Sequence, residues 1–241
     1  MSGSITVVEG NVGAGKTTFI KALSEYLNDG TGSVVVYYEP IFPEYLQLYL
    51  SNIPKYAFMF QSMMIQARIN IFENAMRDVK SGAYVIIDRS IYGDIAFAQM
   101  QIKEGYFTAE EEATYNTLVA KSIIKFNEFQ NLKTFYLSCM PGTCFQRVKK
   151  RGIPEEIKAY TYEYLSKLDE AYDTIMEEYS AKYHNITYYN WDPDVDLNKF
   201  MEENFAATKF GREVGATARW LKEMLNEPPS NNLIQSFGLN T

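Results

Sequence analysis

Residues 10–18 have the composition and spacing of a phosphate-binding loop. The segment reads Gly10-Asn11-Val12-Gly13-Ala14-Gly15-Lys16-Thr17-Thr18 and fits the pattern G-x-x-x-x-G-K-[ST]. Glycines let backbone N–H groups approach phosphate oxygens at the start of a helix. Lys16 would reach the β- and γ-phosphates, and Thr17 would offer its hydroxyl to Mg²⁺. The pattern predicts a nucleotide site without specifying the reaction, and the alternative is a glycine turn that binds nothing.

Two further motifs follow apolar runs of strand type. Glu39 precedes Pro40 after the second run, where a carboxylate can accept a proton from an attacking hydroxyl. Asp88-Arg89-Ser90 closes the third run. Asp88 could hold Mg²⁺ through water, while Arg89 could stabilise charge on a transferred group and keep Glu39 ionised. The alternatives are a solvent-facing charge at Glu39 and a structural salt bridge at Asp88 and Arg89.

These motifs must be positioned by a sheet whose strands alternate with helices. Helical patterns separate five apolar runs suited to buried parallel strands, namely Ile5–Val8, Val34–Tyr38, Tyr84–Ile87, Thr134–Leu137 and Ile186–Tyr189. This order predicts an α/β fold with a parallel sheet covered by helices on both faces. Ligands bind at the carboxyl ends of such strands, where the three motifs lie.

Composition and charge restrict the class of protein. The chain has 241 residues, is 46% hydrophobic and carries a net charge of −7, so we expect one well-cored domain that does not bind nucleic acid polymers. Two cysteines are too few for a disulfide framework or a metal-ligand set. No apolar run approaches the length of a signal segment or membrane span. We therefore expect a cytoplasmic protein without membrane association.

Two long helices and a C-terminal extension complete the expected organisation. Helical periodicity covers Pro54–Val79, and Thr108 is a suitable N-cap for a helix to about Phe129. These two helices could form a dimer face. The nucleotide-binding domain is expected over residues 1–205, and residues 206–241 form an extension with a short helix to about Leu225 and then a loop.

In their order, the motifs resemble those of the deoxyribonucleoside kinase family, which includes deoxycytidine, deoxyguanosine and deoxyadenosine kinases. The resemblance spans about residues 4–200. It rests on the phosphate loop, Glu39-Pro40, Phe60-Gln61, Asp88-Arg89-Ser90-Ile91-Tyr92-Gly93-Asp94, Arg147 to Glu156, and Asp192-Pro193-Asp194-Val195-Asp196. It implies a P-loop kinase fold with a five-stranded parallel sheet and a short helical lid at about 147–157. It also implies use of ATP and Mg²⁺ and a homodimer.

The resemblance also implies roles for individual residues around the nucleoside. Glu39 would be the base that acts on the 5′-hydroxyl, and Gln61 would bind the edge of the nucleobase, with Met64 beside it. An Arg68 and Asp94 pair is found in relatives that accept purine deoxynucleosides or deoxycytidine, whereas thymidine-preferring relatives tend to lack it. For the remaining contacts, the nearest matches are Tyr49 and Glu156 on the deoxyribose and Tyr45, in preference to Phe42, on the base.

The lid departs most from the family pattern. Arg147 and Arg151 lie one helical turn apart, facing a common phosphate region, but Ile153 stands where a further arginine is usual. Charge in the transition state would then be stabilised by Arg151, Arg147, Arg89 and Lys16. Asp192 and Val195 resemble the loop around the adenine of ATP.

The expected activity is ATP-dependent phosphorylation of the 5′-hydroxyl of deoxyadenosine, deoxyguanosine or deoxycytidine, rather than thymidine, in nucleotide salvage. A nucleoside monophosphate kinase of the thymidylate kinase type is one alternative, although Asn11 and Ile41-Phe42 depart from its usual signature. A non-catalytic nucleotide-binding subunit is a second alternative, suggested by Ile153 and the extension from Ala206.

Overall fold

The structure is a computed structural model that describes residues 3–28, 33–40, 42–127, 129, 131–183, 186–191 and 196–209. The expected adenine-loop residues Asp192 and Val195, and the expected helix near Leu225, lie outside these ranges. None of the helices in the described ranges combines the length and apolarity that crossing a bilayer requires.

Five strands form one parallel sheet, as predicted. They are β1 (Ser4–Glu9), β2 (Val34–Tyr37), β3 (Tyr84–Asp88), β4 (Leu132–Ser138) and β5 (Ile186–Asn190), in the spatial order β2-β3-β1-β4-β5. The predicted second strand ends one residue early, at Tyr37, whereas the others extend slightly beyond their apolar runs. Because Val8 is paired with Asp88 and with Phe135, the carboxyl ends of β1, β3 and β4 meet at one edge of the sheet.

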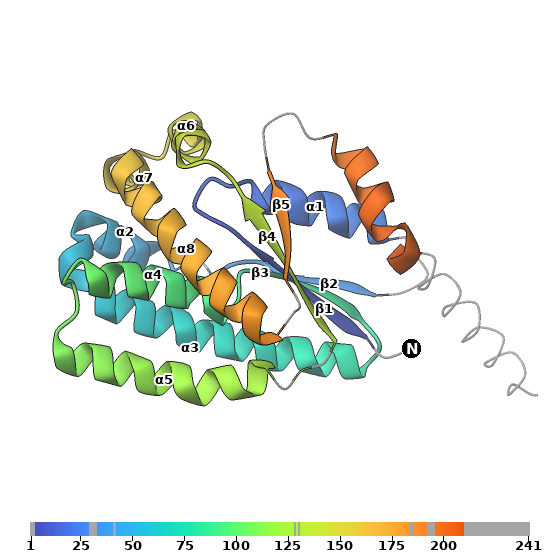
Figure 1. The fold of residues 1–241 in the computed structure, drawn as a ribbon, viewed down its shortest axis with the longest axis horizontal. Coiled ribbons are helices and arrows are strands. Elements are labelled where there is room, and N and C mark those ends of the chain that lie inside the picture. The colour runs from blue at the N-terminus through green and yellow to red at the C-terminus, as the bar shows by residue number, and fades with distance from the viewer. Residues whose placement is uncertain are drawn as a thin grey trace, which may run out of the picture.

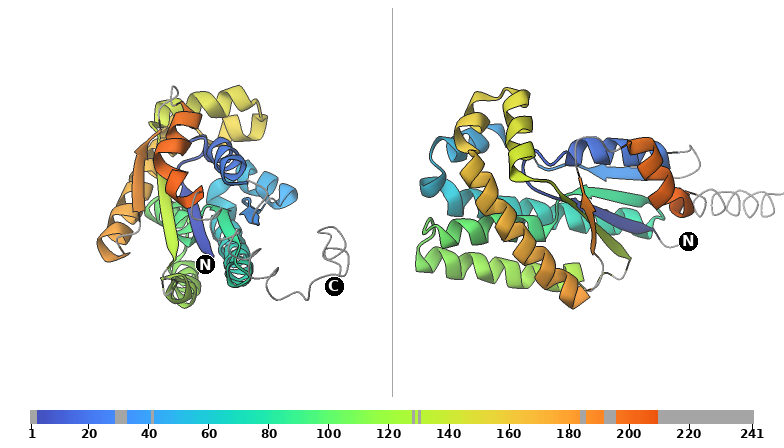
Figure 2. Two further views of the ribbon diagram at one scale, coloured as in Figure 1. Left: turned by 90° about the vertical axis from the view of Figure 1, so that its right-hand side faces the viewer. Right: turned by 45° about the horizontal axis from the view of Figure 1, so that its top comes forward.

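Helices cover both faces of the sheet, so the predicted three-layer arrangement is confirmed (Figure 1). One face carries α1 (Lys16–Leu27) and the helix at 197–209. The other face carries α3 (Ile53–Lys80), α4 (Ile91–Lys103) and α8 (Tyr162–Tyr183), with α5 (Ala109–Asn127) packed beside α3 and α4. The short helices α2 (Pro43–Ser51), α6 (Pro141–Arg151) and α7 (Pro154–Ala159) gather at the carboxyl-terminal edge of the sheet (Figures 1 and 2).

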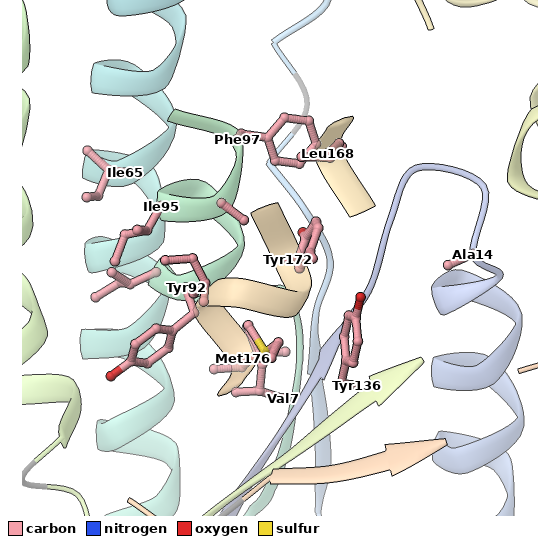
Figure 3. Close-up of a cluster of buried hydrophobic side chains, with 14 of the residues drawn as sticks. Val7, Ala14, Ile65, Tyr92, Ile95, Phe97, Tyr136, Leu168, Tyr172 and Met176 are labelled. Carbon is pink, nitrogen blue, oxygen red and sulfur yellow. The ribbon is translucent and has the colours of Figure 1, made fainter. Parts of the chain in front are cut away.

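Alternation along β1 divides the core into two clusters. Ile5 and Val7 face the α3, α4 and α8 side, while Val8 faces α1. Figure 3 shows Val7 and Tyr172 among the side chains of the larger cluster, between the strands and the helices. Full burial of each large side chain contributes about 1.5–3 kcal/mol, so the layers hold the strand ends in a fixed relation.

Local signals set the ends of the long helices. The Thr108 hydroxyl accepts from the Glu111 N–H at 3.2 Å, and the Glu111 carboxylate accepts from the Thr108 N–H at 2.8 Å, which makes the expected cap of α5 a reciprocal capping box.

Helices α3 and α5 lie side by side, as a dimer face formed by both would require (Figure 2). The helix at 197–209 runs across the expected domain boundary at residue 205, and Phe205 is buried in the smaller core cluster.

Candidate active site

The turn after β3 is held in an unusual backbone conformation. Arg89 has a φ of 65° and is the only non-glycine residue with positive φ in the described ranges. Glu9, at the end of β1, accepts hydrogen bonds on Oε1 from the Ser90 N–H at 2.6 Å and the Ser90 hydroxyl at 2.7 Å. The Ser90 hydroxyl in turn accepts from the Tyr92 N–H at 3.2 Å and caps α4. The strained turn, which costs about 1–3 kcal/mol, is therefore fixed from both sides.

The Glu39 carboxylate lies between two arginine side chains. Arg89 Nη1 donates to both carboxylate oxygens, at 2.6 and 2.7 Å, and Arg68 Nη2 donates to Oε1 at 2.7 Å. Burial raises the pKa of Glu39, but the charges of Arg89, Arg68 and Lys16 outweigh it and lower the pKa to about 2. The side chain is still 34% exposed. Glu39 is thus an oriented carboxylate that the neighbouring positive charges keep ionised and that is partly accessible to solvent.

Arg68 connects Glu39 to the expected base pocket. Its Nε donates to Asp94 Oδ1 at 2.7 Å, and its Nη1 donates to the Asp88 carbonyl oxygen at 3.0 Å. Asp94 Oδ2 is buried without a hydrogen-bond partner among the described residues, and burial raises the pKa of Asp94 to about 6 against the charge of Arg68. Gln61 and Met64 are buried on the same helix as Arg68. The structure therefore joins Arg68 to Asp94 and places Gln61 and Met64 on the helix of Arg68, which accounts for four of the five residues expected at the base.

Lys16 contacts the phosphate loop to which it belongs. Its Nζ donates to the Gly10 and Asn11 carbonyl oxygens at 2.9 and 2.8 Å, and burial and the nearby Arg89 lower its pKa to about 8. The Asn11 side chain links the loop to α8 by donating to the Leu165 carbonyl oxygen at 2.9 Å. Thr17 is exposed at the start of α1. The loop is therefore anchored from within and from α8, while Thr17 stays accessible.

The two lid arginines differ in their contacts. Arg147 Nη1 donates to the carbonyl oxygens of Ala14 at 2.9 Å and Gly13 at 3.4 Å, and so lies on the loop. Arg151 Nη1 instead donates to Glu156 Oε2 at 2.8 Å, and its side chain is 45% exposed. The structure thus brings Arg147 to the phosphate region but pairs Arg151 with the residue expected on the deoxyribose.

The two tyrosines expected at the nucleoside occupy different environments. The Tyr49 ring is buried and stacks on Phe60 with centroids 4.4 Å apart. Tyr45 lies on the outside of α2 and is 48% exposed. Tyr49 is therefore fixed in place beside the Gln61 helix, whereas Tyr45 lacks comparable packing.

Sequence reasoning missed several residues at this edge of the sheet. Glu9 could have been found, because it stands at a strand end directly before the phosphate loop. Trp191 has Nε1 2.8 Å from the position of a Cβ on Gly15, whose φ is +99°, so only glycine fits between α1 and the indole. Gln101 and Tyr164 each form a hydrogen bond with the Tyr49 hydroxyl, and neither carries a local signal in the sequence.

The donor atoms fit a nucleotide with a magnesium ion. Asp88 Oδ1 is buried without a hydrogen-bond partner among the described residues, and burial raises the pKa of Asp88 against the opposing charge of Lys16. A cation beside this oxygen would satisfy it. In the part of the chain that the structure describes, no three His, Cys, Asp or Glu side chains gather as a metal site. A few protein oxygens together with phosphate and water are the usual environment of Mg²⁺.

Comparison with known proteins finds deoxynucleoside kinases over most of the chain and, over 61% of it, a subunit of NADH dehydrogenase of Bos taurus at 25% identity. A protein-family model described as deoxynucleoside kinase matches residues 6–211. A deoxyguanosine kinase of Dictyostelium discoideum is 32% identical over 200 residues, covering 83% of this chain and 68% of that protein. A deoxyadenosine kinase of the same organism is 27% identical over 248 residues, covering 98% and 91%. The structure of deoxyadenosine kinase from M. mycoides with bound dCTP superposes with a TM-score of 0.68 at 23% identity, covering 83% of this chain and 97% of that chain.

Proposed function

Since this chain belongs to the deoxynucleoside kinase family and is a deoxynucleoside kinase, we propose that it transfers the γ-phosphate of ATP to the 5′-hydroxyl of a deoxyribonucleoside. The product is the 5′-monophosphate, as in nucleotide salvage. The single observation that carries the proposal is the Glu39 carboxylate, held by Arg68 and Arg89 at the strand edge that also carries the phosphate loop.

Glu39 acts as the base in this proposal. A 5′-oxygen placed against the exposed side of the carboxylate gives up its proton as its bond to phosphorus forms. The low pKa of Glu39 keeps the carboxylate ionised and oriented by two guanidinium groups. Proton transfer to so weak a base proceeds late, when the attacking oxygen has already become acidic by bonding to phosphorus.

Positive charge at the loop stabilises the transferred phosphoryl group. Lys16 and Arg89 lie on the loop side of Glu39, and Arg147 reaches the loop from α6. Bound magnesium, held by Thr17 and by Asp88 through water, would neutralise charge on the phosphates. Closing α6 and α7 over both substrates excludes water, and Arg151 would leave Glu156 for the phosphates in that step.

The polar side chains expected at the base favour a nucleobase with both donors and acceptors on its edge. Arg68, Asp94 and Gln61 supply fixed polar groups, and a base that leaves one of them unpaired costs about 1–3 kcal/mol. We therefore propose deoxyadenosine, deoxyguanosine or deoxycytidine as substrates in preference to thymidine. The names of two relatives, deoxyguanosine kinase and deoxyadenosine kinase, support the two purine deoxynucleosides as the first substrates to test.

The proposed function also includes a dimer, a cellular location and further contacts to both substrates. The subunit pairs with a second copy through α3 and α5, works in the cytoplasm, and binds the deoxyribose through Tyr49 and Glu156, with Tyr45 on the base and Asp192 and Val195 on the adenine. The family match over residues 6–211 argues against the nucleoside monophosphate kinase alternative. The relatives that cover 83% and 98% of this chain have kinase names, which argues against a non-catalytic subunit, whereas a relative named as a subunit of NADH dehydrogenase covers 61% of it.

The test is phosphoryl transfer by the purified chain with ATP and Mg²⁺. ADP formation is measured with each of the four deoxynucleosides and each of their monophosphates. We expect turnover with deoxyadenosine, deoxyguanosine or deoxycytidine, and loss of turnover in Lys16→Met but not in Lys21→Met, which makes the same change at an exposed position of α1. Turnover with monophosphates alone, or ATP consumption that ignores added nucleoside, would overturn the proposal.

A further inference from the structure

A buried amide is hydrogen-bonded to a pair of tyrosines from two other helices. Gln101 of α4 is 0% exposed, and its Nε2 donates to the Tyr49 hydroxyl at 2.7 Å. The Tyr49 hydroxyl, from α2, is 2.9 Å from the Tyr164 hydroxyl, from α8. Neither the sequence motifs nor the proposed function uses Gln101 or Tyr164.

This cluster lies between the expected base pocket and the lid. The Tyr49 ring stacks on Phe60, the residue before Gln61. On the other side, the Tyr164 ring is 5.4 Å from the Tyr160 ring. Burial raises the pKa of Tyr160 well above its usual value, and the neighbouring Tyr164 hydroxyl and the Glu39 and Glu156 carboxylates raise it further. In the proposed function, which places the 5′-oxygen at Glu39 and the deoxyribose at Tyr49 and Glu156, the sugar lies beside this group of phenols.

Counting protons shows what the cluster offers to a ligand. The Tyr49 and Tyr164 hydroxyls hold two protons between them, and one of these makes the hydrogen bond that joins the two oxygens. Gln101 donates to Tyr49, so it takes up an acceptor site and no phenol proton. One O–H of the pair is left to donate elsewhere. A neighbouring oxygen of the sugar is the acceptor that such a donor suits.

We propose that Gln101 is a positioning residue that orients the Tyr49–Tyr164 pair so that one phenol O–H donates to the 3′-oxygen of the deoxyribose. The inference rests on the proposed function and adds Gln101 and Tyr164 to its sugar site. Gln101 Oε1 is buried without a partner among the described residues, so this amide is incompletely satisfied. Stability alone would favour an apolar side chain at such a position, which is why a role in orientation explains the amide better.

The experiment compares a deoxynucleoside with its 2′,3′-dideoxy analogue in the parent and in Gln101→Leu. The analogue lacks only the 3′-oxygen and is therefore an internal control for everything else in the site. We expect kcat/KM for the deoxynucleoside to fall about 5- to 10-fold in the variant, mostly through KM, with kcat/KM for the analogue nearly unchanged. The ratio of the two substrates therefore falls by the same factor. Gln99→Leu makes the same change at an exposed position of α4 and should keep the parent ratio.

The remaining outcomes distinguish a failure of the role of Gln101 from a failure of the proposed function. An unchanged ratio, or an equal loss with both substrates, would overturn the role of Gln101. Failure of the parent to phosphorylate any deoxynucleoside would instead overturn the proposed function. If the leucine variant does not fold, Gln101→Met decides the question with an unbranched side chain of similar length. Methionine cannot donate to Tyr49, so the ratio must fall in this variant too, and a parent-like ratio would refute the proposal.

Discussion

Replacing Glu39 with glutamine removes one charge and one proton acceptor at the centre of the site while keeping the size of the side chain. The amide oxygen of the substituted side chain can still accept from one guanidinium, but its NH₂ group would face the other. Arg68 and Arg89, whose side chains are only 3% and 5% exposed, would then share one acceptor oxygen at position 39 in place of two. We expect the chemical step to suffer most, because the amide cannot take a proton from the 5′-hydroxyl.

The magnitude follows from the two functions that the carboxylate serves. Loss of a general base typically lowers kcat by about 10²- to 10⁴-fold, which is about 2.7–5.4 kcal/mol in activation free energy. Loss of the charge pairing destabilises the fold by less than the ~3–5 kcal/mol typical of a fully buried pair, since Glu39 is 34% exposed. Domains have ~5–15 kcal/mol of stability, so the variant should remain folded at 25 °C.

The assay is steady-state kinetics of parent and Glu39→Gln with both substrates varied, together with denaturant unfolding of each. We expect kcat to fall at least ~10²-fold while KM for the nucleoside changes less than ~3-fold. Glu44→Gln, the same substitution at an exposed position of α2, is the control and should be unaffected. A folded Glu39→Gln enzyme with turnover within ~3-fold of the parent would remove Glu39 from the role of base.

Three further predictions follow from the same contacts. The pKa of Glu39 is lowered from 4.5 to about 2, so between these pH values the unfolded chain binds more protons than the folded chain. In denaturant titrations, the excess stability of the parent over Glu39→Gln should therefore be complete above pH 4.5 and shrink as the pH falls towards 2. Gly93→Ala places a Cβ 2.7 Å from Glu9 Oε2 and should lower the free energy of unfolding by about 1–3 kcal/mol. Gly142→Ala, whose Cβ would lie 4.0 Å from its nearest neighbour, should not lower it. Equal unfolding midpoints for these two variants would contradict the packing around Gly93. Arg147→Met removes the contact from α6 to the loop, so KM for ATP should rise about 10-fold or more while KM for the nucleoside stays within ~3-fold. In initial-rate measurements, the reverse pattern would show that Arg147 acts on the nucleoside and not on ATP.

The sequence was sufficient to predict the sheet and the charged centre of the site because those signals are local. Glu39, Asp88 and the phosphate loop each follow an apolar run, and parallel strands bring their carboxyl ends to one edge. The proximity of Arg89 to Glu39 could be predicted from that placement alone, and Arg89 Nη1 donates to both carboxylate oxygens.

Contacts between side chains distant in the sequence could not be predicted in this way. Gln101 reads as one of two similar glutamines on α4, and only the packing of α2 and α8 separates it from the exposed Gln99. The lid shows the same limit. Their one-turn spacing predicts that Arg147 and Arg151 point in similar directions. The chain turns at Gly152, however, and brings Glu156 to Arg151, so that Arg151 pairs with this carboxylate and not with the phosphate loop.

The guanidinium of Arg68 is shared by three acceptors, namely the Glu39 carboxylate, the Asp94 carboxylate and the Asp88 carbonyl oxygen. If Asp94 contacts the base, as the proposed function has it, a substitution there that changes base preference also shifts the group that aligns Glu39. Substitutions at Asp94 and Glu39 should not act independently, and variants selected for a new base should arise first as slow enzymes that regain speed through later changes around Arg68. The evolution of substrate choice in this protein is thereby tied to the evolution of its rate.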